Sequence, residues 1–558
     1  MDFDTLLVSY LGEFGTYQIL ILLFVCSTSF NSVLSNLDYL FTGFTPPFRC
    51  GDGNVEHLMN NLTFQELSKL ISPEVSSSEV DACQMYIYNF TEISVVTARD
   101  LLESNKSDVL TKKCTSWIFS QEDNMRTIVT DFNLVCDRKW YVATSQAVYL
   151  AGFFTIFIGG ILSDRFGRRV VTLGCMLAVM VCRIFVALSP NIYVFMVGRF
   201  FQACSTSNWY TSVFIIALEN IGPSRRTVAG LVPYIFWSVG HLFVSGLSYL
   251  IRDWRVRNFV YLIFIIPYFL HFCFLKESVR WLKTHEKDRQ AAEVVHLIAR
   301  VNKKDLPDHV LADFNEVKKT SEEKVSLMSL LKSRMFIKLT LILVVLWMNV
   351  NTTYYGLIYY IPDMGGNLYL NTLISGGLEL VALLYVFLTL DTRLGRRYSS
   401  SLLFLVAGVI LLVIIFLPSN IAWLKVTLAL IGRLGITAVF AQLYILAAEI
   451  YPTRMRSCGL ALCSSASRFG AVISPYVAKL ATFGVFLPPL IFGVLSLCSA
   501  VLCLLLPETR GKHLKNYDIQ TTQPNTTAVP ETQGLELTEC AKVQEDSKAS
   551  EVKPLQSK

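Results

Sequence analysis

The feature that most constrains this chain is a short basic turn, residues 159–169 (GGILSDRFGRR), that lies between apolar runs at residues 141–162 and 170–188. Three arginines and an aspartate cannot lie in hydrocarbon, so the turn belongs at a membrane surface. A weaker version, residues 391–397 (DTRLGRR), stands between apolar runs about 228 residues further along. The recurrence predicts a chain of two related halves.

A second pair of motifs repeats at nearly the same distance. Arg199 is followed by Glu219 and two arginines in the first half, and Arg433 is followed by Glu449 and two arginines in the second half. Many secondary transporters consist of two related repeats with the substrate site near the membrane midplane. Membrane orientation alone explains a single basic turn, but two motifs repeating at one offset favour the transporter architecture.

Composition excludes several other classes of protein. Of the 558 residues, 53% are hydrophobic and 16% are charged, against about 25% charged in an ordinary soluble domain, which predicts a polytopic membrane protein in contact with lipid. The net charge of +6 does not indicate a nucleic-acid partner, because the basic residues stand in short turns between apolar runs. The sequence contains no P-loop, HExxH or GxSxG motif, so we expect no enzyme, no cofactor and no metal site.

The apolar runs predict an all-α membrane protein with twelve transmembrane helices in two six-helix halves. The runs lie at residues 19–44, 141–162, 170–188, 192–218, 228–251, 259–275, 336–361, 371–389, 400–417, 422–448, 458–482 and 487–506. The first run carries Asn31, Asn36 and Asp38, polar groups that should face a bundle interior or a watery cavity. For Asp38, near the outer end, contact with water is an equally good explanation.

The segment between the first two runs has the features of an extracellular loop. It contains four cysteines, Cys50, Cys83, Cys114 and Cys136, and three glycosylation sequons, at Asn61, Asn89 and Asn105. Disulfides and N-linked glycans belong outside the cell, which places both chain termini in the cytoplasm. Four cysteines pair in three ways, and the sequence does not choose among them.

The resulting organisation has seven parts. They are a cytoplasmic N-terminus (1–18), the first helix (19–44), the disulfide-bonded glycosylated loop (45–140), helices 2–6 (141–275), a cytoplasmic helical linker (276–335), helices 7–12 (336–506) and a disordered cytoplasmic tail (507–558). The basic turns fall on the inner side, as the positive-inside rule requires. The turn at residues 252–257 (RDWRVR) falls outside and violates that rule.

Ionisable residues inside the runs are the candidates for chemistry. Arg468 lies about three turns from either end of its span, where an arginine costs roughly 2.5–3.5 kcal/mol. It requires either a fixed salt bridge to a neighbouring span or a ligand, for which its planar fork suits a substrate carboxylate or other anion. Glu379, mid-span in the eighth run, is the candidate partner of Arg468 or a cation site.

Charged residues near the inner ends of the helices are predicted to form salt bridges that rearrange during transport rather than to touch substrate. They are Asp164, Arg165, Arg168, Arg169, Glu219, Arg225, Arg396, Arg397, Glu449 and Arg454.

Aromatic residues become relevant if the substrate is an amine, because a cation over a ring face gains roughly 0.5–2 kcal/mol. Tyr210 and Phe214 stand at helical spacing in the fourth span, although a lipid-facing position explains any single ring as well. Tyr354 in the seventh span lies within two turns of Asn349 and Asn351, and we expect these three polar groups to face a cavity.

Taken together, these motifs resemble the organic cation, organic anion and carnitine transporters of the major facilitator superfamily. The resemblance covers nearly everything but the tail and is carried by residues 11–15, Gln18, and residues 134–140, 164–169, 276–282, 366–371, 448–453 and 507–509. One departure is Val279, where the family pattern usually has a proline.

The resemblance implies roles for particular residues. Cation carriers of this family have an aspartate in the eleventh span, whereas anion and carnitine carriers have an arginine, as at Arg468, and residues 465–476 look most like the carnitine branch. The family positions that line the central cavity match Tyr210, Phe214, Tyr354, Glu379 and Arg468. Asn31 matches only loosely an asparagine of the carnitine carriers, which leaves sodium coupling open.

These observations predict a plasma-membrane carrier that moves small organic ions by alternating access, with sodium or proton coupling. Arg468 would bind a carboxylate, while the aromatic residues and Glu379 would bind an ammonium group, so carnitine-like zwitterions satisfy both ends. The alternative substrate class is an organic anion that is exchanged, with Arg468 selecting it. A membrane receptor without transport explains the glycosylated loop but not the repeated charged turns. The oligomeric state is not predicted.

Overall fold

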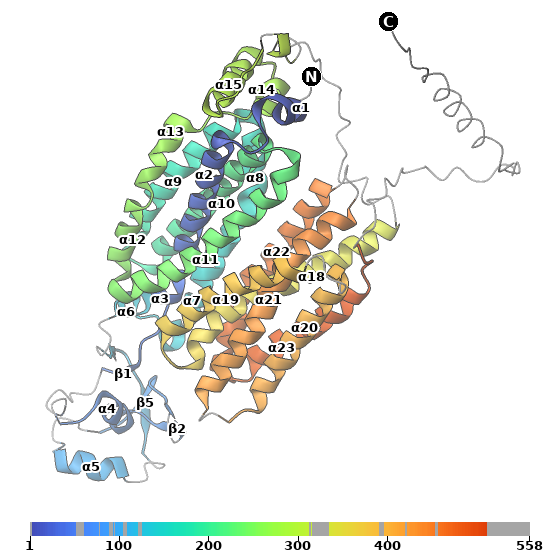
Figure 1. Ribbon diagram of the computed structural model, residues 1–558. Coiled ribbons are helices and arrows are strands. Elements are labelled where there is room, and N and C mark those ends of the chain that lie inside the picture. The colour runs from blue at the N-terminus through green and yellow to red at the C-terminus, as the bar shows by residue number, and fades with distance from the viewer. Residues whose placement is uncertain are drawn as a thin grey trace, which may run out of the picture. The chain divides into compact units, whose positions relative to one another are not determined.

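The computed structural model describes the helical bundle and most of the loop that precedes the second span (Figure 1). The described residues are 3–51, 58, 61–76, 79–88, 93, 95–103, 109–120, 125–307, 309–311, 314, 334–389, 395–418, 421–451 and 456–509. The predicted disordered tail beyond residue 509, much of the end of the linker, Asn89, Asn105 and Arg454 therefore lie outside the described residues.

Twelve long helical segments within the described residues form the bundle. The first half contains α2 (Thr16–Asn36), α7 with α8 (Trp140–Ala151, Ile156–Phe166), α9 (Arg168–Ala187), α10 (Ile192–Asn220), α11 (Arg226–Leu250) and α12 with α13 (Trp254–Ile263, Leu270–Phe274). The second half contains α18 (Arg334–Tyr360), α19 (Leu368–Thr389), α20 (Gly395–Val413), α21 (Ala422–Ile450), α22 (Arg456–Lys479) and α23 (Leu487–Leu504). The predicted twelve-helix, two-half fold is confirmed.

Ten of these segments are long and apolar enough to cross a membrane. The other two, α10 and α22, are more polar, and they carry Arg199 and Arg468 respectively. The two halves, blue to green and yellow to red in Figure 1, meet along two seams, α11 against α19 and α7 against α22. The two more polar helices, α10 and α22, and the two contacts between the halves therefore lie around the centre of the bundle.

The repeated basic turns have the same construction in both halves. In the first, both carboxylate oxygens of Glu277 accept hydrogen bonds, each 3.0 Å long, from the backbone N–H groups of Arg168 and Arg169 at the start of α9. In the second, Glu508 accepts from the N–H groups of Arg396 and Arg397 at 3.1 Å. A carboxylate at a helix N-terminus satisfies orphan donors and the helix dipole.

Each capped turn also contains a glycine with positive φ. Gly167 has φ +105°, and Gly395 has φ +67°. A Cβ atom would lie 2.4 Å from a Glu277 oxygen at Gly167 and 2.6 Å from Glu508 at Gly395. Only glycine fits such a backbone and such an approach, so the repeat seen in the sequence corresponds to a repeated structural device.

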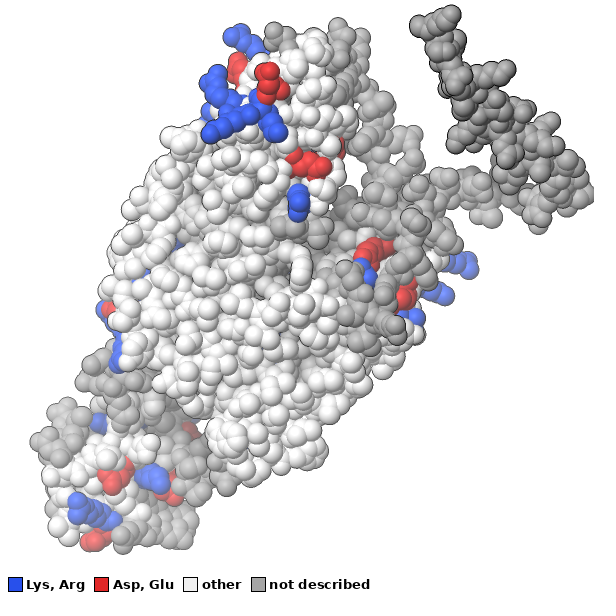
Figure 2. All heavy atoms as spheres, in the orientation of Figure 1, with Lys and Arg blue, Asp and Glu red and all other residues white. Residues whose placement is uncertain are grey.

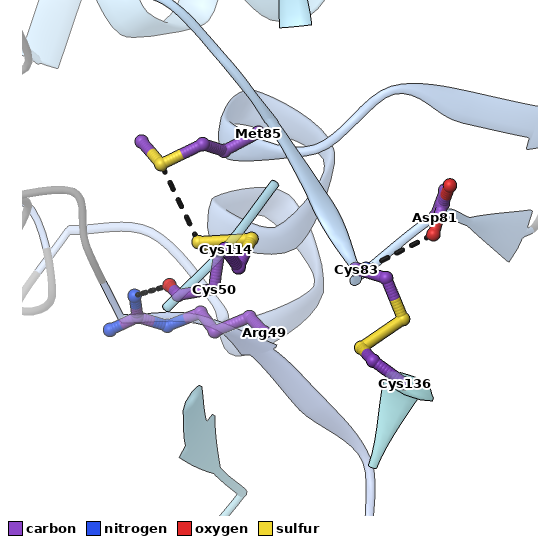
Figure 3. The surroundings of a disulfide bond; sticks show 7 residues. All are labelled: Arg49, Cys50, Asp81, Cys83, Met85, Cys114 and Cys136. Atoms are coloured by element: carbon purple, nitrogen blue, oxygen red, sulfur yellow. Dashed lines mark hydrogen bonds between the residues drawn. A yellow bond between two sulfur atoms is a disulfide. The ribbon is translucent and has the colours of Figure 1, made fainter. Parts of the chain in front are cut away.

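The loop after the first helix folds into a small domain. Strands β1 (Phe48–Cys50) and β6 (Trp117–Phe119), β2 (Glu74–Ser76) and β3 (Glu79–Val80), and β4 (Gln84–Tyr86) and β5 (Thr111–Lys113) form antiparallel pairs beside helices α4 (Phe64–Ile71) and α5 (Val95–Glu103). Disulfides join Cys50 to Cys114 and Cys83 to Cys136 (Figure 3). This is one of the three pairings that the sequence left open.

The first predicted glycosylation site lies on the surface of this domain. Asn61 is exposed and precedes α4, whose N-cap is Thr63, the hydroxyl residue of the same sequon. Hydrogen bonds from the backbone N–H and the hydroxyl of Thr63 hold the pKa of the Glu66 carboxyl below its ordinary value. The capping box fixes the chain beside Asn61.

The linker forms helices, as its apolar spacing predicts. In α15 (Asp288–Val301) the buried positions include Ala291, Val294, Val295 and Ile298, and they share a core with α1 (Phe3–Leu6) and the π-helix at Leu7–Leu11. Val279 is buried in α14 (Val279–Thr284). Figure 2 shows charged side chains gathered over these helices, over the disulfide-bonded domain and at the right edge of the molecule, with few on the broad band between them.

Asp38 is not solvated by water. It is 5% exposed, and its Oδ1 lies 2.5 Å from the Arg257 Nε and accepts a 2.9 Å hydrogen bond from the Tyr261 hydroxyl. Nearby, Arg255 bonds Asp131 at 3.1 Å. Carboxylates thus pair with two arginines of the turn at residues 252–257, the turn that departs from the positive-inside rule in the predicted topology.

Asp38→Asn tests this buried pair. The substitution leaves the Arg257 guanidinium buried without its countercharge, so we expect the free energy of unfolding to fall by about 3–5 kcal/mol. Thermal unfolding of detergent-solubilised protein measures the change. Asp137→Asn is the matched control, because the side chains of the Lys113–Asp137 pair are 83% and 89% exposed, and such pairs contribute about 0–1 kcal/mol. Equal losses would contradict this account.

Candidate binding cavity

A cavity of about 360 Å³ lies between the two halves. The first half lines it with Ser29, Ser32, Phe153, Ile156, Ser207, Tyr210, Thr211, Phe214, Tyr234, Trp237 and Ser238. The second half lines it with Tyr354, Tyr355, Glu379, Leu383, Thr437, Phe440, Ala441, Tyr444, Ser464 and Arg468. Nine of these residues are aromatic and two are charged, so the cavity suits an organic ion of modest size.

Five of the six predicted binding residues line this cavity: Tyr210, Phe214, Tyr354, Glu379 and Arg468. The prediction for Asn351 is wrong, because its side chain is 1% exposed and donates to the Trp347 carbonyl one turn back in α18, at 3.1 Å. Asn349 donates to Ser499 at 3.0 Å. An amide side chain in a span can bond to its own helix backbone or to a neighbouring helix. The spacing in the sequence does not distinguish such amides from ones that face a cavity.

Rings on neighbouring helices brace one another around the cavity. Tyr210 and Phe214, one turn apart on α10, stack with centroids 5.8 Å apart. Tyr354 stacks on Phe440 of α21 at 5.6 Å and meets Tyr355 edge-on at 5.2 Å. These rings face the cavity rather than lipid, and their mutual packing fixes faces that can receive a cation.

Glu379 pairs with Arg433 and not with Arg468. Its Oε1 lies 2.6 Å from the Arg433 Nη2 and accepts a 2.7 Å hydrogen bond from the Tyr354 hydroxyl, while Oε2 lies 3.5 Å from Nδ1 of His241. Both carboxylate and guanidinium are buried, with side chains 3% and 2% exposed. The buried charge of Arg433 is therefore compensated within the second half.

Arg468 is the cavity's other charged residue. Its guanidinium carbon lies 5.3 Å from the centroid of the Phe153 ring, and no salt bridge involves it in the part of the chain that the structure describes. The alternative of a fixed salt bridge is therefore not realised here. An arginine with its fork unpaired beside an aromatic cavity is a site for a carboxylate.

Sequence reasoning missed two aromatic lining residues and Arg433, which pairs with the lining residue Glu379. Arg433 was noticed only as a marker of the repeat, and Tyr234 and Trp237 of α11 were not singled out. The position of Arg433 in the sequence could have identified it, because Arg433, like Arg468, is an arginine far from either end of its span. For the aromatic residues of α11, helical spacing alone does not distinguish the cavity from lipid.

Two buried arginines of the first half, Arg183 and Arg199, donate hydrogen bonds to neutral groups. Arg199 donates to the Ser35 carbonyl at 2.5 Å and to the Gln146 amide oxygen at 2.9 Å. Arg183 donates to Asn31 at 3.1 Å and to Ser35. The side-chain oxygen of Asn31 therefore already accepts a hydrogen bond from the Arg183 guanidinium. This disfavours a sodium ion at that oxygen, because the two positive charges would repel each other.

Side-chain contacts near the disulfide-bonded domain join the two halves. Gln146 of α7 donates to the Tyr359 hydroxyl of α18 at 2.5 Å, and Tyr359 donates to Asn36 of α2 at 3.4 Å. Phe41 stacks on Tyr369 at 5.4 Å. These contacts connect the two halves.

Several of the charged residues that are predicted to rearrange during transport form ion pairs, each within its own half. Arg168 lies 2.8 Å from Asp164 and 3.5 Å from Glu219, and Arg396 lies 3.3 Å from Glu449. In the residues that the structure describes, no ion pair of these charged residues joins the two halves. Two further arginines bond carbonyls, Arg169 to Phe272 and Arg397 to Leu504, and two are exposed, Arg165 and Arg225.

Twelve helices in two repeated halves around a central cavity define a membrane transporter of the major facilitator type and not an enzyme. The sequence model of the sugar (and other) transporter family matches residues 82–520. This chain belongs to that family and, because a solute carrier family 22 member is 32% identical to it over 90% of its length, also to solute carrier family 22.

The relatives cover nearly the whole chain. Solute carrier family 22 member 3 of Mus musculus is 32% identical over 516 residues, which are 90% of this chain and 92% of the relative. The organic cation transporter protein of Drosophila melanogaster is 31% identical over 92% of this chain and 93% of its own length. Among solved structures, the inward-open E. coli xylose transporter XylE covers 89% of this chain and 98% of its own with a TM-score of 0.54 at 15% identity, which shows the fold.

A double-mutant cycle tests the Glu379–Arg433 pair. Arg433→Gln leaves Glu379 buried with neutral donors, and we expect it to cost about 3–5 kcal/mol of stability. The double variant Glu379→Gln/Arg433→Gln should lose less than the sum of the single variants, with a coupling energy of about 0.5–3 kcal/mol. Thermal unfolding of the four purified proteins measures it, and strictly additive losses would contradict the pairing.

Proposed function

We propose that the protein carries small organic ions that bear a carboxylate, above all zwitterions such as carnitine, across the plasma membrane by alternating access. The observation that carries the proposal is Arg468, a guanidinium in a cavity lining with no salt bridge among the described residues. Its charge has a cost in the span unless a ligand compensates it, and a carboxylate offers the matching bidentate geometry.

The other end of such a substrate fits the aromatic lining. The stacked pairs Tyr210–Phe214 and Tyr354–Phe440 present ring faces, each worth roughly 0.5–2 kcal/mol to an ammonium group. Glu379 contributes partial negative charge, because Arg433 already binds one of its oxygens. In this proposal the rings supply most of the affinity for the ammonium end, and Glu379 orients it.

One observation favours a second candidate, an organic anion exchanger. Since Glu379 is neutralised by Arg433, Arg468 is the uncompensated charge of the described lining, and the cavity region is net positive. Two relatives from Drosophila melanogaster, an organic cation transporter protein and an organic cation transporter-like protein, are 31% and 29% identical to this chain. A guanidinium without a countercharge repels a purely cationic substrate. We therefore do not transfer the substrate class in the names of those relatives to this chain without change.

The proposal places both termini in the cytoplasm and the disulfide-bonded domain outside. The inner clusters at Arg168 and Arg396 would exchange partners as the halves rock, while contacts such as Gln146–Tyr359 would break on the outer side. For the driving ion we favour protons over sodium, because Arg183 occupies Asn31 and the solved structures of this fold include a D-xylose-proton symporter.

Uptake in transfected cells tests the function. Labelled carnitine, tetraethylammonium and p-aminohippurate, each with and without sodium, are compared in the wild type and in Arg468→Ala. We expect carnitine uptake by the wild type, and at least a tenfold loss in the variant, since a hydrogen bond to a charged group is worth about 1.5–3 kcal/mol.

Surface biotinylation and Arg468→Lys are the controls. The lysine variant keeps the charge but not the fork, so it should retain part of the uptake. Normal carnitine transport by Arg468→Ala would exclude the carboxylate role, and absence of that variant from the surface would make Arg468 structural. Uptake of p-aminohippurate alone would identify the anion exchanger, and uptake of none of the three would favour a receptor.

A further inference from the structure

His241 lies where the two halves meet. It is on α11 of the first half, its side chain is 0% exposed, and its Nδ1 lies 3.5 Å from Oε2 of Glu379 on α19 of the second half. Gly376, one turn before Glu379, has no side chain, and a Cβ there would lie 3.2 Å from the His241 Cγ. The close approach of the two helices holds the imidazole against the carboxylate.

The facing atoms have unused hydrogen-bonding capacity. Both ring nitrogens of His241 and Oε2 of Glu379 are buried without a hydrogen-bond partner. A neutral imidazole carries one proton for its two nitrogens, whereas the protonated ring donates from both. A proton bound at His241 would therefore place a donor and a positive charge directly on an unpaired carboxylate oxygen.

The charged groups around this pair are few. Behind Glu379 lies Arg433 of α21, and the Tyr354 hydroxyl of α18 bonds the other carboxylate oxygen. Of the other helices packed against α11, α2 carries no charged residue, and the charged groups of α10 have partners of their own: Arg199 with Gln146, and Glu219 with Arg168. Among the described residues, Glu379, which lines the cavity, is thus the charged group in direct contact with His241.

We propose that His241 is a proton-binding site that sets the charge selectivity of the cavity through Glu379. This inference rests on the proposed function, since it concerns how the same cavity treats ammonium and carboxylate groups. With His241 neutral, the negative charge of Glu379, a lining residue, attracts an ammonium group in the cavity. With His241 protonated, the ring donates to Oε2 of Glu379, and a positive charge is added beside a site that already has Arg433 and Arg468 nearby.

The consequence is a linkage between protons and substrate. A proton at His241 and a cation in the cavity compete for Glu379, so each weakens the other's binding by the same factor. A substrate that is bound only through its carboxylate at Arg468 does not meet this competition. Because the contact joins α11 to α19, relative movement of the halves changes it, and the two steps of transport need not bind the proton equally.

Competition measurements test this directly. Uptake of labelled carnitine, or of labelled p-aminohippurate if the wild type carries only that, is inhibited with tetraethylammonium and with unlabelled p-aminohippurate at pH 7.5 and pH 6.0. In the wild type we expect the ratio of the inhibitory concentration of tetraethylammonium to that of p-aminohippurate to rise at least about fivefold on acidification.

Two variants fix the charge of the site. His241→Gln should give the wild-type ratio of pH 7.5 at both pH values, and His241→Lys should give a high ratio at both. His271→Gln is the matched control, because His271 is also fully buried in the first half but packs on Phe24 and Trp209; it should keep the wild-type pH dependence. Surface biotinylation normalises each uptake.

The outcomes separate the two proposals. Unchanged pH dependence in His241→Gln, or the same ratio in the glutamine and lysine variants, overturns the role of His241 while leaving the carrier function standing. If the lysine variant does not reach the surface, the comparison of wild type with His241→Gln decides. Uptake of neither tracer by the wild type overturns the proposed function and this inference with it.

Discussion

The cost of a charge inside a membrane span governs this structure. Each fully buried arginine of the bundle has its guanidinium bonded: Arg257 to Asp38, Arg433 to Glu379, Arg199 to Gln146 and Arg183 to Asn31. These bonds tie helices that are distant in sequence. Arg468, which is half-buried, has no salt bridge among the described residues, and it lines the central cavity. The chemistry of the cavity follows from that residue.

The features that followed from sequence were those encoded locally or by repetition. The basic turns at Arg168 and Arg396 predicted two halves, and the structure caps both with a glutamate, Glu277 or Glu508. Apolar spacing predicted the helices of the linker. In these cases the spacing of the apolar residues and the positions of the charged residues within one segment are enough to predict the structure.

The features that sequence could not supply depend on which helices become neighbours. Glu379 is as plausible a partner for Arg468 as for Arg433 until α19, α21 and α22 are packed, and the same holds for the two disulfides, one of which joins Cys50 to Cys114. Asp38 was ambiguous for the same reason, since Arg257 lies more than two hundred residues away. Asn351 was misjudged because an amide can satisfy itself on its own helix.

Equilibrium binding of carnitine and carnitine methyl ester to the purified carrier tests the central claim, that the Arg468 guanidinium binds a carboxylate. The ester keeps the ammonium group and loses the negative charge. The account predicts that the wild type binds carnitine at least about tenfold more tightly than the ester and that Arg468→Gln binds the two alike. Equal affinities for the two ligands in the wild type would contradict it.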